Sequence, residues 1–321
     1  MRTAYIIYYE QEAQKNSVFI EMLRDESAKY DIELRYISFE NVNIMSDSKF
    51  MKTFEAAVFV INRTREYKLS KRFENIKIKV FHSSKITELG NDKFKTYLYL
   101  KDYFNTHPAP VNDKEWIAET VLIKSYELKD ALAKYIGKDY VIKSVDGHGG
   151  SEVFLLKDVN DKCEIDISDK AKITCLQDMK KESNISEKII YESLKGHDCV
   201  IQKCIDSDGN DIRVYVLFGK IYAAVLRHGN DGFKSNFSLG GSVSEYFPDE
   251  NQKIFIEKII NAFGKDELNM AGIDFILTRD GRLIFNELEE MVGSRMLYKC
   301  SKHDIVKEYV EQIAKYEVNM L

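Results

Sequence analysis

The sequence predicts a fold of the α/β plus α+β class, and three observations lead to this prediction. Over residues 1–90, short apolar runs alternate with segments of helical periodicity, a pattern typical of a small parallel sheet. Further along the chain, apolar runs come in pairs separated by turn residues, which favours antiparallel sheets. The chain has 321 residues, 44% of them hydrophobic and 31% charged, so it is an ordinary globular protein too long for one small core. We expect an N-terminal α/β domain over 1–90 and two α+β subdomains over 91–200 and 201–321.

The N-terminal segment shows alternating strand and helix patterns. Thr3–Tyr9 has the pattern of a buried strand, Glu12–Tyr30 has helical periodicity, and Glu33–Phe39 is again a strand pattern, so together they predict a βαβ unit. We then expect, in order, a third strand, a short helix and a fourth strand at Ala56–Ile61, Lys68–Glu74 and Lys77–Phe81. No GxGxxG follows the first strand, so a dinucleotide site of the Rossmann type is not supported.

Two arginines, Arg63 and Arg65, come directly after the third predicted strand. The C-terminal edge of a parallel sheet is a natural ligand crevice, so these side chains are candidates for holding a carboxylate or a phosphate. Two solvated arginines at the end of a strand explain the same residues equally well.

The middle segment contains a strand, a glycine-rich loop and a second strand. A helix over Asp92–Tyr103, a proline-containing connection and helices around Trp116–Lys124 and Leu128–Tyr135 are expected before it, and the sequence VIKSVDGHGGSEVFLL follows. Backbone N–H groups of such a loop can approach phosphate oxygens closely, and Lys143 on the entering strand would supply a positive charge. The loop is not a Walker A motif. A plain hairpin turn also accounts for its glycines, with His148 as a hydrogen-bond donor of the loop.

The last segment is predicted to be an antiparallel sheet covered by helices. The expected strands are Asp198–Ile205, Asp211–Phe218 and Ile221–Leu226, and the expected helices are Asp249–Phe263 and His303–Tyr316. The dipeptide Gly219-Lys220 predicts a tight turn between the second and third strands, and a loop rich in hydrogen-bond donors, SNFSLGGS, follows the third. Residues 157–195 carry no motif that we can assign.

An acidic hairpin near the C-terminus is the most informative stretch. Two apolar runs flank an Asp-Gly dipeptide, which favours a two-residue type I′ turn. That turn pairs Ile276 with Phe285 and Asp274 with Glu287, and Glu289 points to the same face as Glu287. Opposed like charges repel, so the three acids call for a cation, and oxygen-only ligands suit Mg²⁺ or Mn²⁺. The alternative is a solvated hairpin whose acids only keep the edge soluble, and a three-residue loop would shift the register.

Charge and cysteine content argue against several classes of protein. The net charge is −5 and the pI about 5.8, so no general basic field recruits nucleic acid. The five cysteines are odd in number and lack CxxC spacing, so neither a disulfide framework nor a zinc site is indicated. The N-terminal apolar run is too short for a signal peptide and no run has the length of a membrane span, so we expect a cytoplasmic protein.

In their order and spacing, four of these elements resemble the ATP-grasp superfamily. They are the lysine-bearing strand with its glycine loop, VIQKCI leading to DIRVYVL, FKSNFSLGG, and AGIDFIL with FNELEE. The resemblance covers roughly residues 90–321 and is strongest to the branch that contains the ribosomal protein S6 glutamate ligases and glutathione synthetases. It implies an ATP-grasp fold, in which an N-terminal pre-ATP-grasp domain precedes two α+β subdomains that clasp ATP.

The resemblance also implies roles for individual residues. The positions that match the family's ATP site are the phosphate lysines, the glycine loop, the adenine hinge and a ribose acid: Lys93, Lys143, Asp146, Gly149, Gly150, Ser151, Gln202, Lys203, Ile205 and Asp211. The positions that match the acyl-phosphate site and its donor loop are Arg213, Lys234, Asn236 and Gly241. The metal ligands would be Asp274, Glu287 and Glu289, and the candidates for gripping substrate carboxylates are Arg227, Arg295 and Arg63.

Three positions depart from the family pattern. Lys203 stands where the S6-ligase-like pattern has an acid, Lys234 where it has an arginine, and Glu289 where the usual metal ligand is asparagine. The sequence Met291-Val292-Gly293-Ser294-Arg295 also replaces the more usual small-Pro-Gly turn. These departures leave the identity of the substrates open.

The implied activity is that of an ATP-dependent carboxylate–amine ligase, which forms an amide or peptide bond. A carboxylate would attack the γ-phosphate to give an acyl phosphate, and an amine would then displace phosphate, with ATP and two Mg²⁺, or Mn²⁺, as cofactors. The partners would be a small-molecule carboxylate and an amine, such as an amino acid or peptide, without nucleic acid or membrane, and a homodimer is compatible with the sequence. Two alternatives stay open: an ATP-grasp phosphotransferase acting on a hydroxyl, and a nucleotide-binding regulatory protein without turnover.

Overall fold

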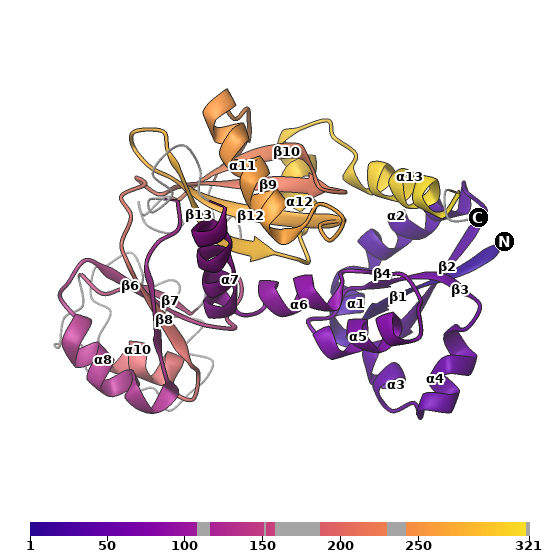
Figure 1. Cartoon of the computed structure of the whole chain (residues 1–321), viewed down its shortest axis with the longest axis horizontal. Helices are drawn as coiled ribbons and strands as arrows, with labels where there is room; N and C mark the ends of the chain where they lie inside the picture. The colour runs from indigo at the N-terminus through magenta and orange to yellow at the C-terminus, as the bar shows by residue number, and fades with distance from the viewer. Residues whose placement is uncertain (108–115, 151, 158–186, 230–241, 319–321) are drawn as a thin grey trace.

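The computed structural model contains three β-sheets. It describes residues 1–107, 116–150, 152–157, 187–229 and 242–318. Figure 1 shows the N-terminal sheet at the right, a five-stranded sheet at the top and a four-stranded sheet at the lower left. No helix in these described ranges has both the length and the apolar composition needed to cross a membrane.

The N-terminal lobe is a parallel sheet with the strand order β2-β1-β3-β4, as the βαβ pattern predicted. Its elements are β1 (Arg2–Tyr8), α1 (Glu10–Lys15), α2 (Ser17–Ala28), β2 (Ile32–Ser38), α3 (Phe39–Asn43), α4 (Asp47–Phe54), β3 (Ala57–Asn62), α5 (Tyr67–Asn75) and β4 (Val80–Phe81). The single helix expected over Glu12–Tyr30 is interrupted at Asn16. The expected fourth strand begins only at Val80, because Lys77 takes part in the turn after α5 with a φ of 61°.

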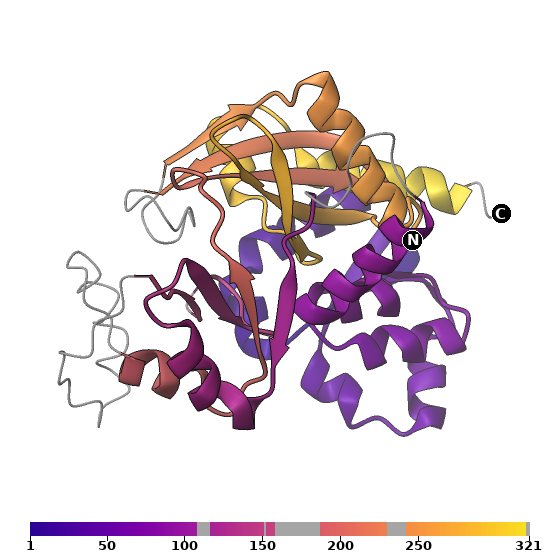
Figure 2. The ribbon, with the colours of Figure 1, turned by 60° about the vertical axis from the view of Figure 1, so that its left-hand side comes forward.

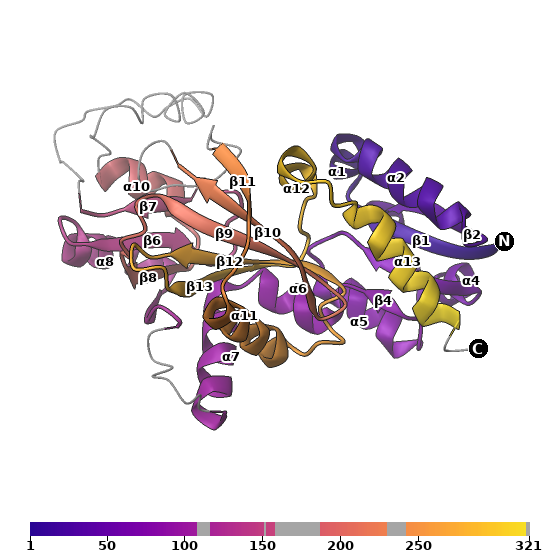
Figure 3. The same cartoon turned by 90° about the horizontal axis from the view of Figure 1, so that it is seen from above.

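The five-stranded sheet is antiparallel, with the order β11-β10-β9-β12-β13. The elements of this region are α6 (Ser84–Gly90), α7 (Lys93–Thr106), β9 (Asn210–Leu217), β10 (Lys220–His228), β11 (Ser242–Tyr246), α11 (Glu250–Phe263), β12 (Met270–Leu277), β13 (Leu283–Glu289), α12 (Arg295–Cys300) and α13 (Ile305–Val318). Val214 and Val216 pack in the core that contains α7 and α11, whereas Tyr215 and Leu217 pack in the core of the N-terminal lobe. The sheet therefore shares one core with that lobe, and α13 lies beside α2 (Figure 3).

The four-stranded sheet has the order β5-β8-β6-β7 and lies below the five-stranded sheet in Figure 2. Its elements are β5 (Thr120–Ile123), the 3₁₀ helix η2 (Ser125–Glu127), α8 (Leu128–Tyr135), β6 (Tyr140–Ser144), β7 (Val153–Leu155), α10 (Glu187–Leu194) and β8 (Cys199–Lys203). The helix expected around Trp116–Lys124 is wrong, because Thr120–Ile123 pairs with β8 as an edge strand. The run TVLI contains three β-branched residues, which fit a strand better than a helix.

Candidate active site

A cavity of about 580 Å³ lies between the four-stranded lobe and the five-stranded sheet. Most of the predicted site residues line it: Lys93, Lys143, Gly149, Gly150, Gln202, Lys203, Ile205, Asp211, Arg213, Arg227, Asp274, Glu287 and Glu289. Three predicted residues, Asp146, Arg63 and Arg295, lie elsewhere. Four more, Ser151, Lys234, Asn236 and Gly241, lie outside the described residues. The fold therefore brings residues far apart in the sequence to one cavity.

The acidic hairpin has the predicted opposed pair, with Asp274 on β12 facing Glu287 on β13. Its turn differs from the expected two-residue turn. The backbone N–H of Thr278 donates to the carbonyl oxygen of Arg282 at 3.0 Å, which leaves three residues in the loop. The last of them is Gly281, whose φ of 83° favours glycine. A three-residue loop alone shifts the register and would separate the two acids.

A β-bulge in the hairpin restores the acidic pair. The predicted pairing of Ile276 with Phe285 is wrong, because the register shifts on the turn side of Asp274. The extra residue in β13 is Asn286, which lines the cavity and accepts a hydrogen bond from Lys143 Nζ at 3.0 Å. Sequence reasoning missed Asn286, since strict alternation would turn it away from the acidic face.

Two arginines, Arg213 and the buried Arg227, hold the carboxylate of Asp274. Arg213 donates from Nε and Nη2 to its two oxygens at 2.7 Å each, and Arg227 donates from Nη2 at 2.7 Å. Arg227 also donates to Asp211 at 2.5 and 2.6 Å, and Arg213 reaches Glu289 at 3.2 Å. Burial opposes the ionisation of Asp274, but the two guanidinium groups outweigh it and lower its pKa to about 2. These five side chains form one charge network on the sheet side of the cavity.

Glu287 and Glu289 are the hairpin acids with fewer charged partners. Glu287 Oε1 lies 3.6 Å from Lys93 Nζ, and the contact of Glu289 to Arg213 described above is its one ion pair among the described residues. Burial raises the pKa of Glu289, and the nearby carboxylates add to this rise while Arg213 opposes it. A divalent cation would relieve that repulsion, and two carboxylates beside the amide oxygen of Asn286 are a donor set that fits Mg²⁺ or Mn²⁺.

Two lysines reach the same hairpin from different elements. Lys93 is the first residue of α7, and its Nζ donates to the carbonyl oxygen of Gly147 at 2.5 Å as well as lying near Glu287. Lys143 lies on β6 and is buried beside Asn286. Burial lowers the pKa of Lys143 to about 8; the charge of Glu287 opposes this shift and that of Lys93 adds to it. Basic side chains from two elements thus face the acids of a third across the cavity.

The glycine-rich loop joins β6 to β7 beside these lysines. Backbone hydrogen bonds fix its start, from Val145 N to Asp198 O at 2.9 Å and from Lys93 N to Val145 O at 3.1 Å. Gly149 and Gly150 have φ angles of 68° and 75°, which other residues adopt only with strain. Both glycines line the cavity, where a bound phosphate could approach their backbone closely.

The sequence matches the model of the RimK-like ATP-grasp domain over residues 112–313. The chain belongs to the RimK-like ATP-grasp family. It is 27% identical over 316 residues to the uncharacterized protein MG011 of Mycoplasma genitalium, which covers 97% of this chain and 92% of that protein. It is 27% identical over 302 residues to the tetrahydromethanopterin:alpha-L-glutamate ligase of Methanocaldococcus jannaschii, with coverages of 90% and 91%. The solved structure of D-alanine–D-alanine ligase from Bacillus anthracis, complexed with ATP, matches with a TM-score of 0.62 at 12% identity, covering 100% of this chain and 98% of that one.

These comparisons confirm the predicted ATP-grasp fold and the predicted class of enzyme, an ATP-dependent carboxylate–amine ligase. ATP-grasp ligases use ATP together with Mg²⁺ or Mn²⁺, and they act on small-molecule or peptide substrates. The cavity between the two sheets is lined by both basic and acidic side chains.

The segment predicted to be the adenine hinge runs from the end of β8 toward β9. Gln202 donates from Nε2 to Thr120 Oγ1 at 2.8 Å, so its amide is held by the edge strand β5. The residue directly after β8 is bound to the same lobe, because Cys204 N donates to Asp139 O at 2.9 Å. These contacts fix the segment that crosses from the four-stranded lobe to the five-stranded sheet.

Two of the three arginines predicted to bind a substrate carboxylate are buried and bound by other residues of this chain. Arg227 is 3% exposed, and Asp211 and Asp274 bind its guanidinium group. Arg63 is 6% exposed and binds groups outside the cavity. Neither arginine offers an open guanidinium fork to a carboxylate in the cavity, so the expectation for these two residues is corrected. Arg295, at the start of α12, is exposed.

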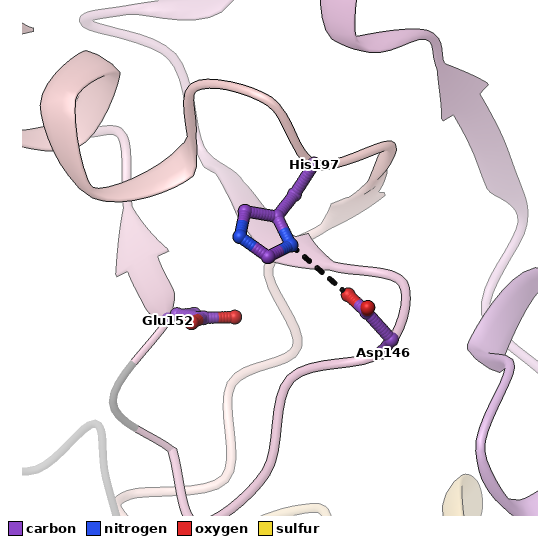
Figure 4. A group of neighbouring side chains, drawn as sticks. All are labelled: Asp146, Glu152 and His197. Atoms are coloured by element: carbon purple, nitrogen blue, oxygen red, sulfur yellow. Dashed lines mark hydrogen bonds and ion pairs between the residues drawn. The ribbon is translucent and has the colours of Figure 1, made fainter.

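Asp146 does not line the cavity, and its carboxylate points toward His197, with Oδ1 3.3 Å from Nδ1 (Figure 4). Glu152 lies beside them, and the ligand atoms of the three side chains lie within 4.8 Å of one another. In the described part of the chain no other group of three or more acids, histidines or cysteines meets this closely. Asp146 and His197 are exposed, and a surface ion pair accounts for their contact, so we assign no metal there.

Sequence reasoning also missed Glu290, the residue after the last hairpin acid. It is 2% exposed, and Asn91 Nδ2 donates to its Oε1 at 2.7 Å. Burial and the charge of Glu289 raise its pKa to about 7, although Asn91 opposes the rise. A Cβ at Gly90 would lie 2.5 Å from Glu290 Oε2, so the glycine allows α6 to approach the end of β13. Nothing in the run Glu-Leu-Glu-Glu distinguishes this buried acid from its neighbours.

Proposed function

We propose that the cavity is the ATP site of this ligase and that the acyl phosphate forms beside the acidic hairpin. The observation that carries the proposal is the convergence of Lys93, Lys143 and Arg213 on one cavity with Glu287 and Glu289. Three basic side chains and two acids suit a triphosphate with its metal. A hairpin whose acids only kept an edge soluble would need no such arrangement.

In this proposal each side of the cavity has its own task. The two lysines and the glycine-rich loop bind the phosphates, the backbone of the hinge at Lys203 and Ile205 binds adenine, and Asp211 lies toward the ribose. Glu287 and Glu289, with the amide oxygen of Asn286, hold Mg²⁺, which when bound neutralises the phosphoryl oxygens. Asp274 acts through Arg213, whose guanidinium group it holds through two hydrogen bonds.

The reaction needs no protein nucleophile. An oxygen of the acid substrate attacks the γ-phosphorus, the bond to the bridging oxygen breaks, and ADP leaves. The amine nitrogen then attacks the acyl carbon, the carbon–oxygen bond of the acyl phosphate breaks, and inorganic phosphate leaves as the nitrogen loses a proton. Arg213 and the lysines stabilise the charge that develops on the oxygens, through positioned electrostatics.

We propose an amino acid or a peptide amine as the second substrate, with glutamate as the first candidate. The support is the name of the Methanocaldococcus jannaschii relative, an α-L-glutamate ligase that aligns over 90% of this chain. Arg295 and Arg65 are exposed arginines that remain candidates for binding a substrate carboxylate.

Incubation with ATP, Mg²⁺ and amino-acid mixtures tests the reaction, with release of ADP and phosphate as the signal and mass spectrometry of the products. A new amide formed together with ADP supports the proposal. A stable phosphorylated product would identify a phosphotransferase acting on a hydroxyl, and ATP binding without turnover in any mixture would favour a regulatory protein.

The metal assignment has its own test. Glu287→Gln should lower kcat by at least about a hundredfold, because it removes a charge from the proposed metal site. Glu250→Gln is the matched control, since Glu250 is an exposed acid on α11 that pairs with the partly exposed Lys253 one turn along the same helix. Full ATP-dependent turnover in the Glu287 variant would contradict the assignment.

A further inference from the structure

Arg63 connects the N-terminal lobe to the segment that follows the acidic hairpin. It comes directly after β3, and its Nη2 donates to the backbone oxygens of Met291 at 3.2 Å and Val292 at 3.3 Å. Its Nε donates to Tyr8 Oη at 3.1 Å. We call residues 291–293 the strap. One buried side chain of the first lobe thus holds two carbonyl groups of the strap.

The charge of Arg63 is poorly compensated for a buried position. Within the described ranges no carboxylate lies at ion-pair distance from it, and its Nη1 has no hydrogen-bond partner there. Its Cζ instead lies 5.3 Å from the ring centre of Phe19 and 5.8 Å from that of Tyr8. Burial of an incompletely paired cation is unfavourable, so packing alone does not explain an arginine here. An apolar side chain could fill this position, but it could not donate hydrogen bonds to the carbonyl groups of the strap.

The strap also packs against the strand beside the acids. Gly272 on β12 lies opposite Glu289, and a Cβ at this glycine would lie 2.8 Å from Val292 Cγ2 and 3.4 Å from Arg213 Cδ. Tyr215 Oη donates to the carbonyl oxygen of the last strap residue at 3.1 Å. Val292 therefore fills the space over Gly272, next to the Arg213–Glu289 pair.

We propose that Arg63 is a positioning residue for the metal site of this ligase. By holding two carbonyl groups of the strap, it fixes the end of β13 and with it the carboxylate of Glu289 relative to Arg213. The inference rests on the proposed metal role of Glu287 and Glu289. It requires that loosening the strap weakens metal binding more than it weakens the binding of adenine or of the other substrates.

Arg63→Gln and Arg63→Lys test the proposal by titration with Mg²⁺. In Arg63→Gln the Mg²⁺ concentration for half-maximal turnover should rise by about tenfold or more, as is typical when a residue that orients a metal ligand is lost. The kcat at saturating Mg²⁺ should stay close to that of the wild type. Arg63→Lys should show a smaller rise, because the ammonium group can hold one carbonyl but lacks the planar fork.

Amide hydrogen exchange provides a readout without metal, nucleotide or turnover. Exchange over residues 288–294 should be faster in both Arg63 variants than in the wild type, while exchange in β9 stays unchanged. Tyr215→Phe removes an independent anchor of the strap, so it should shift the Mg²⁺ dependence in the same direction. This second anchor keeps the test decisive if an Arg63 variant folds poorly.

Arg72→Gln is the matched control. Arg72 donates from Nη2 to Met45 O at 2.9 Å and to Asp47 at 2.8 Å, and its Cζ lies 3.9 Å from the ring centre of Phe50, all within the N-terminal lobe. Its loss should lower Tm without changing the Mg²⁺ dependence. If the Arg63 variants behave in the same way, with wild-type Mg²⁺ dependence and strap exchange, Arg63 is purely structural and the proposal is overturned. If the wild type itself shows no Mg²⁺-dependent turnover, the proposed function fails instead.

Discussion

The two sides of the cavity hold their charged groups in opposite ways. On the five-stranded sheet, Asp274 and Arg227 are buried and Arg213 is largely so, and both arginines donate to Asp274 at 2.7 Å. On the four-stranded lobe, Lys143 is buried and donates a hydrogen bond to the neutral amide of Asn286, and the pair between Asp146 and His197 is exposed. On the sheet side the charge of Asp274 is paired within the protein, whereas on the lobe side the buried cation Lys143 has a neutral hydrogen-bond partner.

Because of this difference, we expect the two sides to affect different properties, namely the stability of the protein and its affinity for ligand. A buried charge whose partners belong to the protein stabilises the fold, and the loss of one partner leaves the others unpaired. A buried charge whose partner arrives with the ligand destabilises the free protein and contributes to binding. We therefore expect substitutions on the sheet side to lower the free energy of unfolding, and substitutions on the lobe side to lower ATP affinity.

Asp274→Asn should have the largest effect. The amide has nearly the same shape but leaves Arg213 and Arg227 without their shared charge, so the free energy of unfolding should fall by about 3 kcal/mol and turnover should be lost. Urea denaturation measures the first effect and ADP release the second. Asp198→Asn on the lobe side is the control, because Asp198 pairs with an exposed lysine and its loss should matter little. Equal losses of stability in both variants would contradict the proposed difference between the two sides of the cavity.

Lys143→Met should show the reverse pattern. The methionine keeps much of the length of the side chain and removes a buried charge, so the free energy of unfolding should stay the same or increase. The KM for ATP should rise by at least about tenfold, because a charged hydrogen bond to phosphate is lost. Calorimetry of ATP binding and urea denaturation of the same sample give both quantities. A loss of stability as large as that of Asp274→Asn would contradict the proposed task of the lobe side.

Much of the fold could be predicted from local periodicity, because amphipathic segments bury one face wherever they pack. The parallel N-terminal strands and the two long C-terminal helices are examples. The segment around Trp116–Lys124 could not be predicted in this way. Its conformation depends on pairing with β8, a strand far away in the sequence, and a short apolar run fits either a helix or a strand.

The same limit applies to the site: patterns along a single segment predict some of its contacts, and others depend on which segments lie side by side in the fold. Alternation along two strands was enough to predict that Asp274 faces Glu287. It could not predict Asn286, because a bulge changes the face that a residue points to. Nor could it separate Arg227, which the protein itself binds, from an arginine left open for substrate. Sequence identifies the charge, whereas the partner depends on which strands lie side by side.

The pH dependence of ATP binding sharpens the comparison further. The pKa of Lys143 is about 8 in the folded protein and 10.5 ordinarily, so between these values the folded protein releases a proton that the unfolded chain keeps. The contribution of this lysine to the free energy of unfolding therefore rises with pH in this window. ATP affinity should fall several-fold over the same window, because the cation is lost. Calorimetry between pH 7 and about 9.5 measures the ATP affinity, and Lys143→Met should remove most of its dependence on pH.

His197→Ala should have the smallest effect. Its partner Asp146 lies at the start of the glycine-rich loop, but both side chains are exposed, and surface pairs of this kind contribute little. The loop start is held by backbone hydrogen bonds instead, from Val145 N to Asp198 O and from Lys93 N to Val145 O. ATP affinity should change by no more than about twofold, and the free energy of unfolding by an amount close to the error of measurement. A large loss of ATP affinity would show that the exposed pair sets the conformation of the loop, and the lobe side of the cavity would then be as preorganised as the sheet side.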